Sequence, residues 1–265
     1  MVEVIIDDVL ENLAKMSGIE LKQIVINAHC QSSSLGFKPA DKVNIIAGVP
    51  GLTVANKESF GLLNIYLDRS IFAIEDQQVK QKTLFFHITH EFCHASIADI
   101  GLLEIVHYNL FGGKFVTSDS EEEFSHIINT LKENVQVDSR LAQDPELMES
   151  FLLSNMPDFI ALKRRIKKIK RMNKSDSFHV LVELLHLTSV SRHIKINGYA
   201  SGAYRTMATN FDSLFHLDLS MALRDAELME MLKSIYDELL TLCNNGGNST
   251  LIRNNLRRFW DQGLN

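Results

Sequence analysis

Two histidines and a glutamate stand close together in the string His90-Glu91-Phe92-Cys93-His94. Residues four apart on a helix lie on one face, one turn above the other, so both imidazoles could bind the same metal ion. Zinc is the ion that this pattern favours, because histidine nitrogen is one of its usual ligands. Glu91 would lie beside the metal, where a carboxylate can take a proton from an activated water and pass it to a leaving amine. These residue types therefore indicate metal-assisted hydrolysis.

The residues around this string predict a buried helix from about Gln77 to about Ile100. The stretch contains no Pro or Gly, Gly101 follows it, and its apolar residues recur at helical spacing: Leu84, Phe85, Ile88, Phe92, Ala95 and Ile97. Polar groups inside a protein need a ligand or hydrogen-bond partners. A bound metal ion would be such a partner for these side chains. The alternative is a helix whose His and Glu side chains have structural partners only, and His87 is expected to be structural in either case.

The stretch from His87 to Ser96 resembles the zincin metallopeptidases. The resemblance implies a zinc-dependent peptidase in which His90 and His94 bind Zn²⁺ and Glu91 is the general base. It also implies a mixed sheet and the motif helix on one side of a cleft, with a mostly helical second half on the other. The expected fold class is therefore α+β and mostly helical, with a small N-terminal sheet.

Two groups of H-E-x-x-H enzymes fit the chain poorly. The metzincin extension needs a Gly and a His where this chain has Ile97 and Ile100, which excludes that branch. Peptide deformylases carry a Glu-Gly-Cys-Leu-Ser string that is absent here. In the remaining gluzincin branch the third ligand is a Glu on a later helix, usually with an Asp four residues after it.

The matching later helix is expected from about Ser120 to Ala142. Its apolar stripe consists of Phe124, Ile127, Ile128, Leu131, Val135 and Leu141. Asn134 and Asp138 fall inside that stripe, whereas Glu133 falls nearly opposite, so Asn stands where a gluzincin has Glu. A buried-face Asp with no cation in its own turn suggests a metal or a ligand His beside it. Asp138 is therefore the predicted third ligand and Glu133 the alternative.

Other residues are weaker site candidates. A loop from Asn197 to Arg205 could supply an oxyanion-stabilising group from Tyr199, Tyr204 or Arg205, although such residues usually pack or meet water. Further ligand options are Glu104, His107, His126 and the Glu121-Glu122-Glu123 cluster. That cluster is more typical of a charged first helical turn.

The chain is long enough, at 265 residues and 45% hydrophobic, to form one domain or two closely packed lobes. We expect an N-terminal lobe over 1–115 and a helical lobe over 116–265 that carries the third ligand. The first lobe should contain an amphipathic helix over 4–16 and strands over 24–26, 43–46 and 62–67. The last strand is a candidate edge for binding an extended peptide, or an ordinary core strand. After residue 115 the sequence predicts helices up to a loop over 244–249, which is followed by a short amphipathic tail.

The composition fits an enzyme of a reducing compartment. The acidic N-terminus lacks the features of a signal peptide, and no apolar run approaches the length of a membrane span. Three widely spaced cysteines, Cys30, Cys93 and Cys243, do not suggest a disulfide framework. The expected location is cytoplasmic. Small size and a basic helix are also similar to effector proteases that bacteria export into other cells through specialised secretion systems, so the working site could differ.

A basic stretch over 163–174 favours a different class of function. It holds eight Lys or Arg in twelve residues, while Leu162, Ile166 and Ile169 share helical spacing. The plain interpretation is an amphipathic helix with a solvated basic face, and the lack of aromatic residues makes nucleic acid an unlikely partner. The sequence thus predicts a zinc endopeptidase acting on a protein or peptide. The alternatives are a catalytically silent, metal-stabilised binding module that uses the basic helix, and a zinc hydrolase acting on a non-peptide bond.

Overall fold

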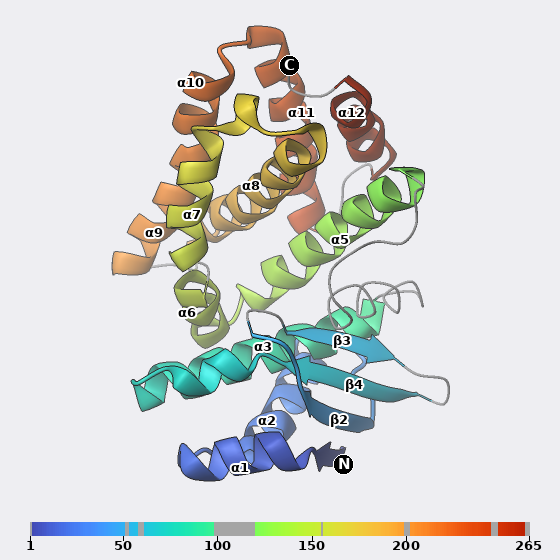
Figure 1. Cartoon of the computed structure of the whole chain (residues 1–265), viewed down its shortest axis with the longest axis vertical. Helices are drawn as coiled ribbons and strands as arrows, with labels where there is room; N and C mark the ends of the chain where they lie inside the picture. The colour runs from blue at the N-terminus through green and yellow to red at the C-terminus, as the bar shows by residue number, and fades with distance from the viewer. Residues whose placement is uncertain are drawn as a thin grey trace. The chain divides into compact units, whose positions relative to one another are not determined.

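The computed structural model describes residues 2–50, 53–57, 61–97, 120–154, 156–198, 202–244 and 249–262. The chain divides into two compact units, Met1–Val116 and Thr117–Asn265. The first unit combines a small sheet with helices, and the described part of the second is built of helices joined by short turns (Figure 1). The expected α+β class, mostly helical with a small N-terminal sheet, is confirmed.

The sheet of the first unit has four strands among the described residues. They are β1 (Glu3–Ile6), β2 (Lys42–Ala47), β3 (Val54–Lys57) and β4 (Leu62–Leu67), in the spatial order β1-β2-β4-β3. β1, β2 and β4 are parallel, with Val43 opposite Leu63, whereas β3 runs antiparallel to β4, with Ala55 opposite Ile65. The sheet is therefore mixed, as the sequence resemblance implies.

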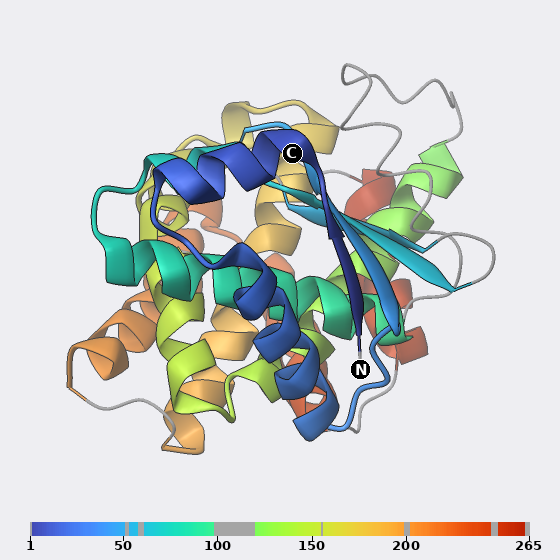
Figure 2. The same cartoon turned by 90° about the horizontal axis from the view of Figure 1, so that it is seen from below.

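Helices α1 (Asp8–Met16), α2 (Leu21–Ser34) and α3 (Gln77–Ile97) complete the first unit, with a short 3₁₀ helix, η1 (Arg69–Ala73). Figure 2 shows these helices beside the strands. Alternate residues of β2 and β4 are fully buried and form one core with the apolar faces of α1, α2 and α3, including Leu10, Val25, Val43, Ile45, Leu63, Ile65, Leu84, Ile88 and Phe92. One continuous apolar core thus holds α3 in place.

The N-terminal prediction of a helix over 4–16 is only partly right. Residues 3–6 form β1, and the helix begins at Asp8. Asp7 separates the two elements, because its Oδ1 accepts a hydrogen bond from the backbone N–H of Leu10 at 2.8 Å and caps α1. Its Oδ2 accepts from the N–H of Ala47 at 2.5 Å, which also ties the end of β1 to the end of β2. The apolar residues before this cap therefore pair as a strand.

The predicted strand over 24–26 is wrong, because these residues lie in α2. Leu21, Val25, Ala28 and Ser32 are buried at helical spacing, and this face packs against α3. A run of three β-branched residues is too short to override that pattern. The predictions over 43–46 and 62–67 are confirmed as β2 and β4.

Of the two interpretations of the strand over 62–67, the ordinary core strand is confirmed and the sheet edge is wrong. β4 pairs with β2 on one side and with β3 on the other, so its backbone is already paired on both sides. β3 is not predicted from the sequence because only four residues form it, which is too few to show the alternation of a strand. β3 and β1 are the outer strands of the described sheet.

The second unit is built around one long helix, α8 (Lys174–Ile196), which packs against α5, α9 and α11. Its buried residues include Phe178, Leu181, Leu184, Leu185, Val190 and Ile194. The other elements are α5 (Ser120–Leu141), α6 (Pro145–Ser154), α7 (Met156–Ile166), the 3₁₀ helix η3 (Ile169–Arg171), α9 (Gly202–Ser213), the π-helical η4 (Leu214–Leu219), α10 (Ser220–Leu223), α11 (Ala226–Cys243) and α12 (Ser249–Gln262). Among the helices described, none is long and apolar enough to cross a membrane.

Candidate metal centre

The histidine pair lies on α3, a helix that the sequence predicts over nearly its observed length. The rings of His90 and His94 are neighbours, with their centroids 4.5 Å apart and their planes at 63°. The Oε1 atom of Glu91 lies 3.3 Å from Nδ1 of His90. Helical spacing thus brings two imidazoles and one carboxylate into a single group.

These polar side chains are removed from solvent. Glu91 is 7% exposed and His94 is 6% exposed. His90 is more open, with 17% of its side chain exposed, and its ring lies 5.8 Å from that of Phe86. Electrostatic interactions are stronger in such surroundings than in water, so this group would interact strongly with a cation.

Contacts with α2 and the core fix the rotation of α3 about its axis. Ile88 and Phe92 are fully buried in the core, and the ring of His29 meets that of Phe92 edge-on at 5.5 Å. The hydroxyl of Ser32 donates to the backbone carbonyl of Thr89 at 3.3 Å. Because these contacts hold one side of α3 against the core, the side that carries His90 and His94 has a fixed orientation within the first unit.

Asp138, the predicted third ligand, belongs to α5 in the second unit. It is 3% exposed, and its Oδ2 accepts a hydrogen bond from Nε2 of His186 on α8 at 2.7 Å. The predicted apolar stripe of α5 is buried, whereas Glu133 and Asn134 are only partly buried. His186 is not among the predicted site residues, and it lies on α8 between the buried Leu185 and Leu187. The structure therefore brings Asp138 together with a histidine of its own unit.

The end of α11 adds a thiol to this part of the second unit. Burial raises the pKa of Cys243 to about 12 from 9.0, with a further increase from the charge of Asp138 and an opposing hydrogen bond from Ser139. Cys243 is 2% exposed. At neutral pH it is therefore a protonated, buried thiol, not a reactive thiolate.

The raised pKa of Cys243 predicts a loss of stability at alkaline pH. Below pH 9 the thiol is protonated in both the folded and unfolded states, so its contribution to stability is complete. Between pH 9 and about 12 only the unfolded chain loses the proton, so the free energy of unfolding falls as the pH rises. We expect a loss on the order of 2 kcal/mol between pH 9 and 11 from this group. Denaturant unfolding under reducing conditions at both pH values measures it.

The control for this experiment compares two alanine variants. Cys243→Ala should show a smaller alkaline loss than the unmodified chain, even if it is less stable at pH 8. Cys30→Ala removes an exposed thiol and should keep the alkaline loss of the unmodified chain. Equal alkaline losses in all three proteins would show that Cys243 does not contribute.

Glu121 is engaged in ion pairs on the surface of the second unit. Its carboxylate is paired with Arg257 and lies 3.3 Å from Nη2 of Arg253. The hydrogen bond from Arg257 lowers the pKa of Glu121. This arrangement agrees with a charged first turn of α5. The side chains of Glu122, Glu123 and His126, and the whole of Glu104 and His107, lie outside the described residues.

The predicted oxyanion loop is wrong in its second half. Tyr204 and Arg205 lie in the first turn of α9, which begins at Gly202. Gly202 has a positive φ of 56°, which glycine adopts without strain at the start of this helix. Arg205 is exposed, and Tyr199 lies outside the described residues. A helix therefore replaces the second half of the expected loop.

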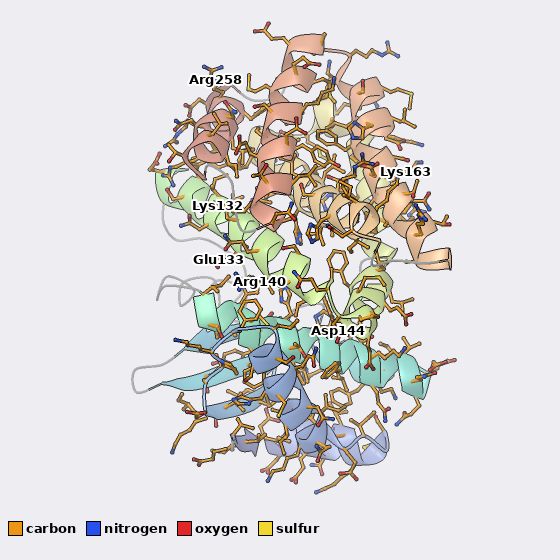
Figure 3. All side chains as sticks on the ribbon, turned by 180° about the vertical axis from the view of Figure 1, so that it is seen from behind. Lys132, Glu133, Arg140, Asp144, Lys163 and Arg258 are labelled. Atoms are coloured by element: carbon orange, nitrogen blue, oxygen red, sulfur yellow. The ribbon has the colours of Figure 1, made fainter. Side chains whose placement is uncertain are left out.

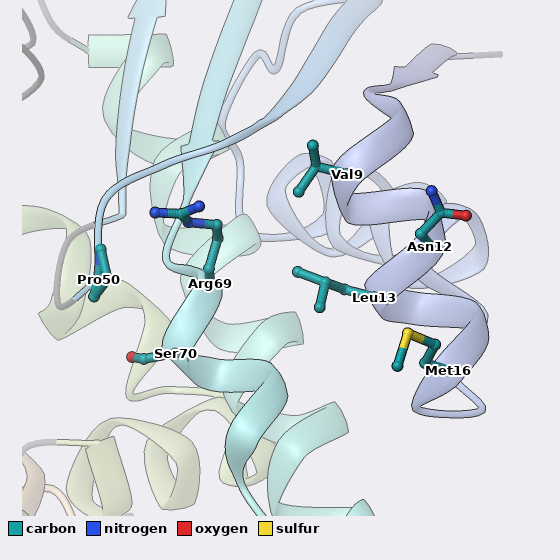
Figure 4. A pocket seen from close by; sticks show the side chains of 7 residues that line it. All are labelled: Val9, Asn12, Leu13, Met16, Pro50, Arg69 and Ser70. Carbon is teal, nitrogen blue, oxygen red and sulfur yellow. The ribbon is translucent and has the colours of Figure 1, made fainter.

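A groove of about 620 Å³ lies elsewhere in the first unit, where the carboxyl ends of β1, β2 and β4 meet (Figure 4). It is lined by Val9, Asn12, Leu13, Met16, Pro50, Arg69 and Ser70. α3 begins near this edge, where the side chain of Gln77 donates to the carbonyl of Ser17 at 2.9 Å. His90 follows thirteen residues later on α3, about 20 Å along the helix axis. The groove is therefore separate from the histidine pair.

The donor atoms of α3 fit part of a zinc site. Two imidazoles on adjacent turns are a common zinc-binding pair, and a structural or catalytic site needs at least one more protein ligand. Within the described residues of each unit, no group of three or more His, Cys, Asp or Glu side chains is spaced to hold a metal ion. The pair on α3 would thus supply two of the ligands that such a site needs.

Comparison of the chain with protein-family models, curated proteins and solved structures finds no match.

Proposed function

We propose that the chain is a zinc-dependent endopeptidase that acts on a protein or peptide substrate. The observation that carries this proposal is the group on α3, in which two neighbouring imidazole rings and a carboxylate are nearly buried on a helix with an apolar core face. In surroundings poor in water, such groups interact strongly with a bound cation. A metal ion held by the two imidazoles would give the carboxylate a coordinated water to act on.

His90 and His94 would hold the metal, and the structure supports a specific choice of nitrogen for His90. Its Nδ1 lies 3.3 Å from the Glu91 carboxylate, so Nε2 is the atom that His90 would offer to the ion. The carboxylate can hold Nδ1 in its protonated form, which keeps Nε2 as an electron-pair donor. Glu91 would therefore also orient His90.

Glu91 would be the general base. When bound, zinc lowers the pKa of a coordinated water from about 15.7 to about 7. Glu91 is 7% exposed, so little bulk water reaches its carboxylate to compete for the proton. The same carboxylate can then deliver that proton to the leaving amine of the peptide.

Asp138 remains the proposed third ligand, with Glu133 as the alternative. The hydrogen bond from Nε2 of His186 to Oδ2 of Asp138 holds this carboxylate in one orientation. Ligating carboxylates are commonly hydrogen-bonded in this way by a neighbouring side chain. Glu133 is less buried than Asp138, which makes it the weaker candidate on the grounds of burial.

The proposal predicts that the purified chain binds zinc at a ratio near one ion per chain. Removing a residue that is hydrogen-bonded to a zinc ligand typically lowers the metal affinity by about 10–100-fold. His94→Ala removes a ligand itself, so it should lower the zinc affinity by more than about a hundredfold. Elemental analysis and competition with a zinc-sensitive dye measure both quantities. Hydrolysis of an unfolded protein substrate should disappear with a chelator and return with zinc.

His87→Ala is the matched control for this experiment. It removes a histidine from the same helix, one that contacts Phe86 at a ring distance of 5.5 Å, and zinc binding should persist. If the unmodified chain contains no transition metal and added zinc restores neither binding nor hydrolysis, the proposal is wrong.

The second candidate function is a binding module in which any metal is structural. A specific observation favours it, namely a group of exposed cations near the end of α7 and after it that form no ion pair with the residues described. Zinc binding without hydrolysis of any unfolded protein would support this alternative. A screen of ester, amide and phosphate substrates at fixed zinc would identify a hydrolase acting on a non-peptide bond.

A further inference from the structure

Five cations of the second unit are exposed and form no ion pair with any residue that the structure describes. They are Arg164, Lys167, Lys168, Lys170 and Arg171. The same stretch holds two paired cations. The Nζ of Lys163 lies 3.4 Å from Asp218, and Arg165 is bound to Glu183 at 2.5 Å. Five like charges within eight positions create a local positive potential on a chain whose net charge is −6.

Buried apolar side chains hold the backbone of this stretch against the second unit. The sequence predicts one amphipathic helix, but α7 ends at Ile166 and a turn leads into η3. At most 1% of Leu162, Ile166 and Ile169 is exposed. The predicted apolar face of this stretch is therefore confirmed. The cations between and after these anchors are left on the solvent side.

Three large apolar side chains are exposed on elements that contact this stretch. Ile160 on α7 is 49% exposed, Leu217 on η4 is 61% exposed and Met221 on α10 is 65% exposed. α7 packs against η4, and η3 packs against α10. Exposed aliphatic residues and unpaired cations therefore occur together on adjoining elements.

The ion pair between Lys163 and Asp218 joins the two sides of this surface. Lys163 is labelled in Figure 3, on α7. Ile160 lies three residues before Lys163 on α7, which places it beside the ion pair. Met221 lies three residues after Asp218, on α10, which follows η4 directly along the chain. We call the five unpaired cations, together with Ile160, Leu217 and Met221, the basic–aliphatic surface.

The described acidic residues near this surface form no ion pair with its five cations. Asp218 is already paired with Lys163. Asp225 caps α11 by accepting a hydrogen bond from the N–H of Leu228 at 3.0 Å. Arg224, which lies between α10 and this cap, is exposed and adds a further cation.

We propose that the basic–aliphatic surface binds the surface of anionic phospholipid membranes. The cations would contact lipid phosphates and carboxylates, and the three aliphatic side chains would enter the boundary between headgroups and acyl chains. A nucleic acid would use the cations but has no use for exposed aliphatic residues, and the stretch holds no aromatic residue for base stacking. This proposal goes beyond the proposed hydrolase and does not depend on it.

Co-sedimentation of the full-length chain with vesicles tests the proposal. We expect binding to vesicles of phosphatidylcholine mixed with phosphatidylserine and little binding to phosphatidylcholine alone. Each Lys or Arg near an anionic membrane raises binding roughly fivefold, so changing Lys167, Lys168 and Lys170 to Gln should lower the partition coefficient about a hundredfold. Added salt should also lower it, because screening shortens the reach of these charges.

The matched charge control is the triple variant Lys22→Gln, Lys38→Gln, Arg258→Gln. It removes the same charge from exposed positions outside the surface and should bind vesicles nearly as the unmodified chain does. The apolar variant Ile160→Gln, Leu217→Gln, Met221→Gln should weaken vesicle binding while leaving binding to single-stranded RNA unchanged. Ile196→Gln, which removes another exposed aliphatic side chain, is its control.

Three outcomes would overturn the proposal. The first is absence of vesicle binding by the unmodified chain, and the second is equal loss of binding in the two charge variants. The third is a polyanion site, indicated if the lysine variant loses RNA and vesicle binding together while the apolar variant binds vesicles normally. Circular dichroism of every variant checks that these surface substitutions leave the helices intact.

Discussion

Glu91→Gln is expected to abolish hydrolysis of an unfolded protein substrate while zinc content stays at the level of the unmodified chain. The amide has nearly the shape of the carboxylate but cannot accept the proton, so the rate should fall by about 10²–10⁴. Glu91 is not proposed as a ligand, and the amide oxygen can still accept the hydrogen bond from Nδ1 of His90, so affinity for the metal should change little. The measurement is the initial rate of cleavage at saturating zinc, together with elemental analysis of the same sample.

Glu75→Gln is the matched control, because Glu75 is an exposed carboxylate shortly before α3. Its activity should equal that of the unmodified chain. Activity of Glu91→Gln within a few-fold of the unmodified chain would remove Glu91 from the mechanism. A Glu91→Gln protein that also loses its zinc would instead indicate that the carboxylate is needed to hold the metal, either directly or through His90. Both results contradict the assigned role.

Long periodic segments are the part of the fold that the sequence predicts best. α3 and α5 each repeat an apolar pattern over more than twenty residues, and both begin and end close to the predicted limits. The sequence predicts neither the helical state of residues 24–26 nor the strand β3, because three or four residues do not contain enough of a period to tell a strand from a helix. The position of β4 inside the sheet depends on pairing with β3, which is a tertiary contact.

In the candidate site, too, the sequence predicts the local relation and does not predict the tertiary contact. The relation between His90 and His94 follows from helical spacing alone, so the sequence was enough to put their rings together. The contact between Asp138 and His186 joins positions 48 apart on α5 and α8, and no local pattern encodes it. The apolar face of α5 predicted that Asp138 would be buried, but not which side chain would meet it.

Asp138→Ala is expected to lower the free energy of unfolding of the second unit by about 2–4 kcal/mol. The substitution removes a buried hydrogen bond of 2.7 Å and leaves Nε2 of His186 without this acceptor in surroundings that are poor in water. Asp138→Asn keeps the shape and one acceptor oxygen, so its loss should be smaller. Denaturant unfolding followed by circular dichroism measures each change.

Asp237→Ala is the control, because it removes an exposed carboxylate from α11 and should change stability by less than about 0.5 kcal/mol. A double-mutant cycle with His186→Ala tests whether the loss comes from the pair, since the double variant should then cost much less than the two single losses combined. Additive losses would contradict an interaction between the two side chains.

Zinc affinity, measured on the Asp138→Asn protein, separates the two roles of this residue. If Asp138 is the third ligand, the affinity should fall far more than the modest stability loss would explain, because the amide is a poor zinc ligand. If Asp138 serves only to hold His186, stability falls and zinc affinity stays unchanged. In that case Glu133→Gln should be tested next, since the proposed hydrolase still needs a third ligand from the protein.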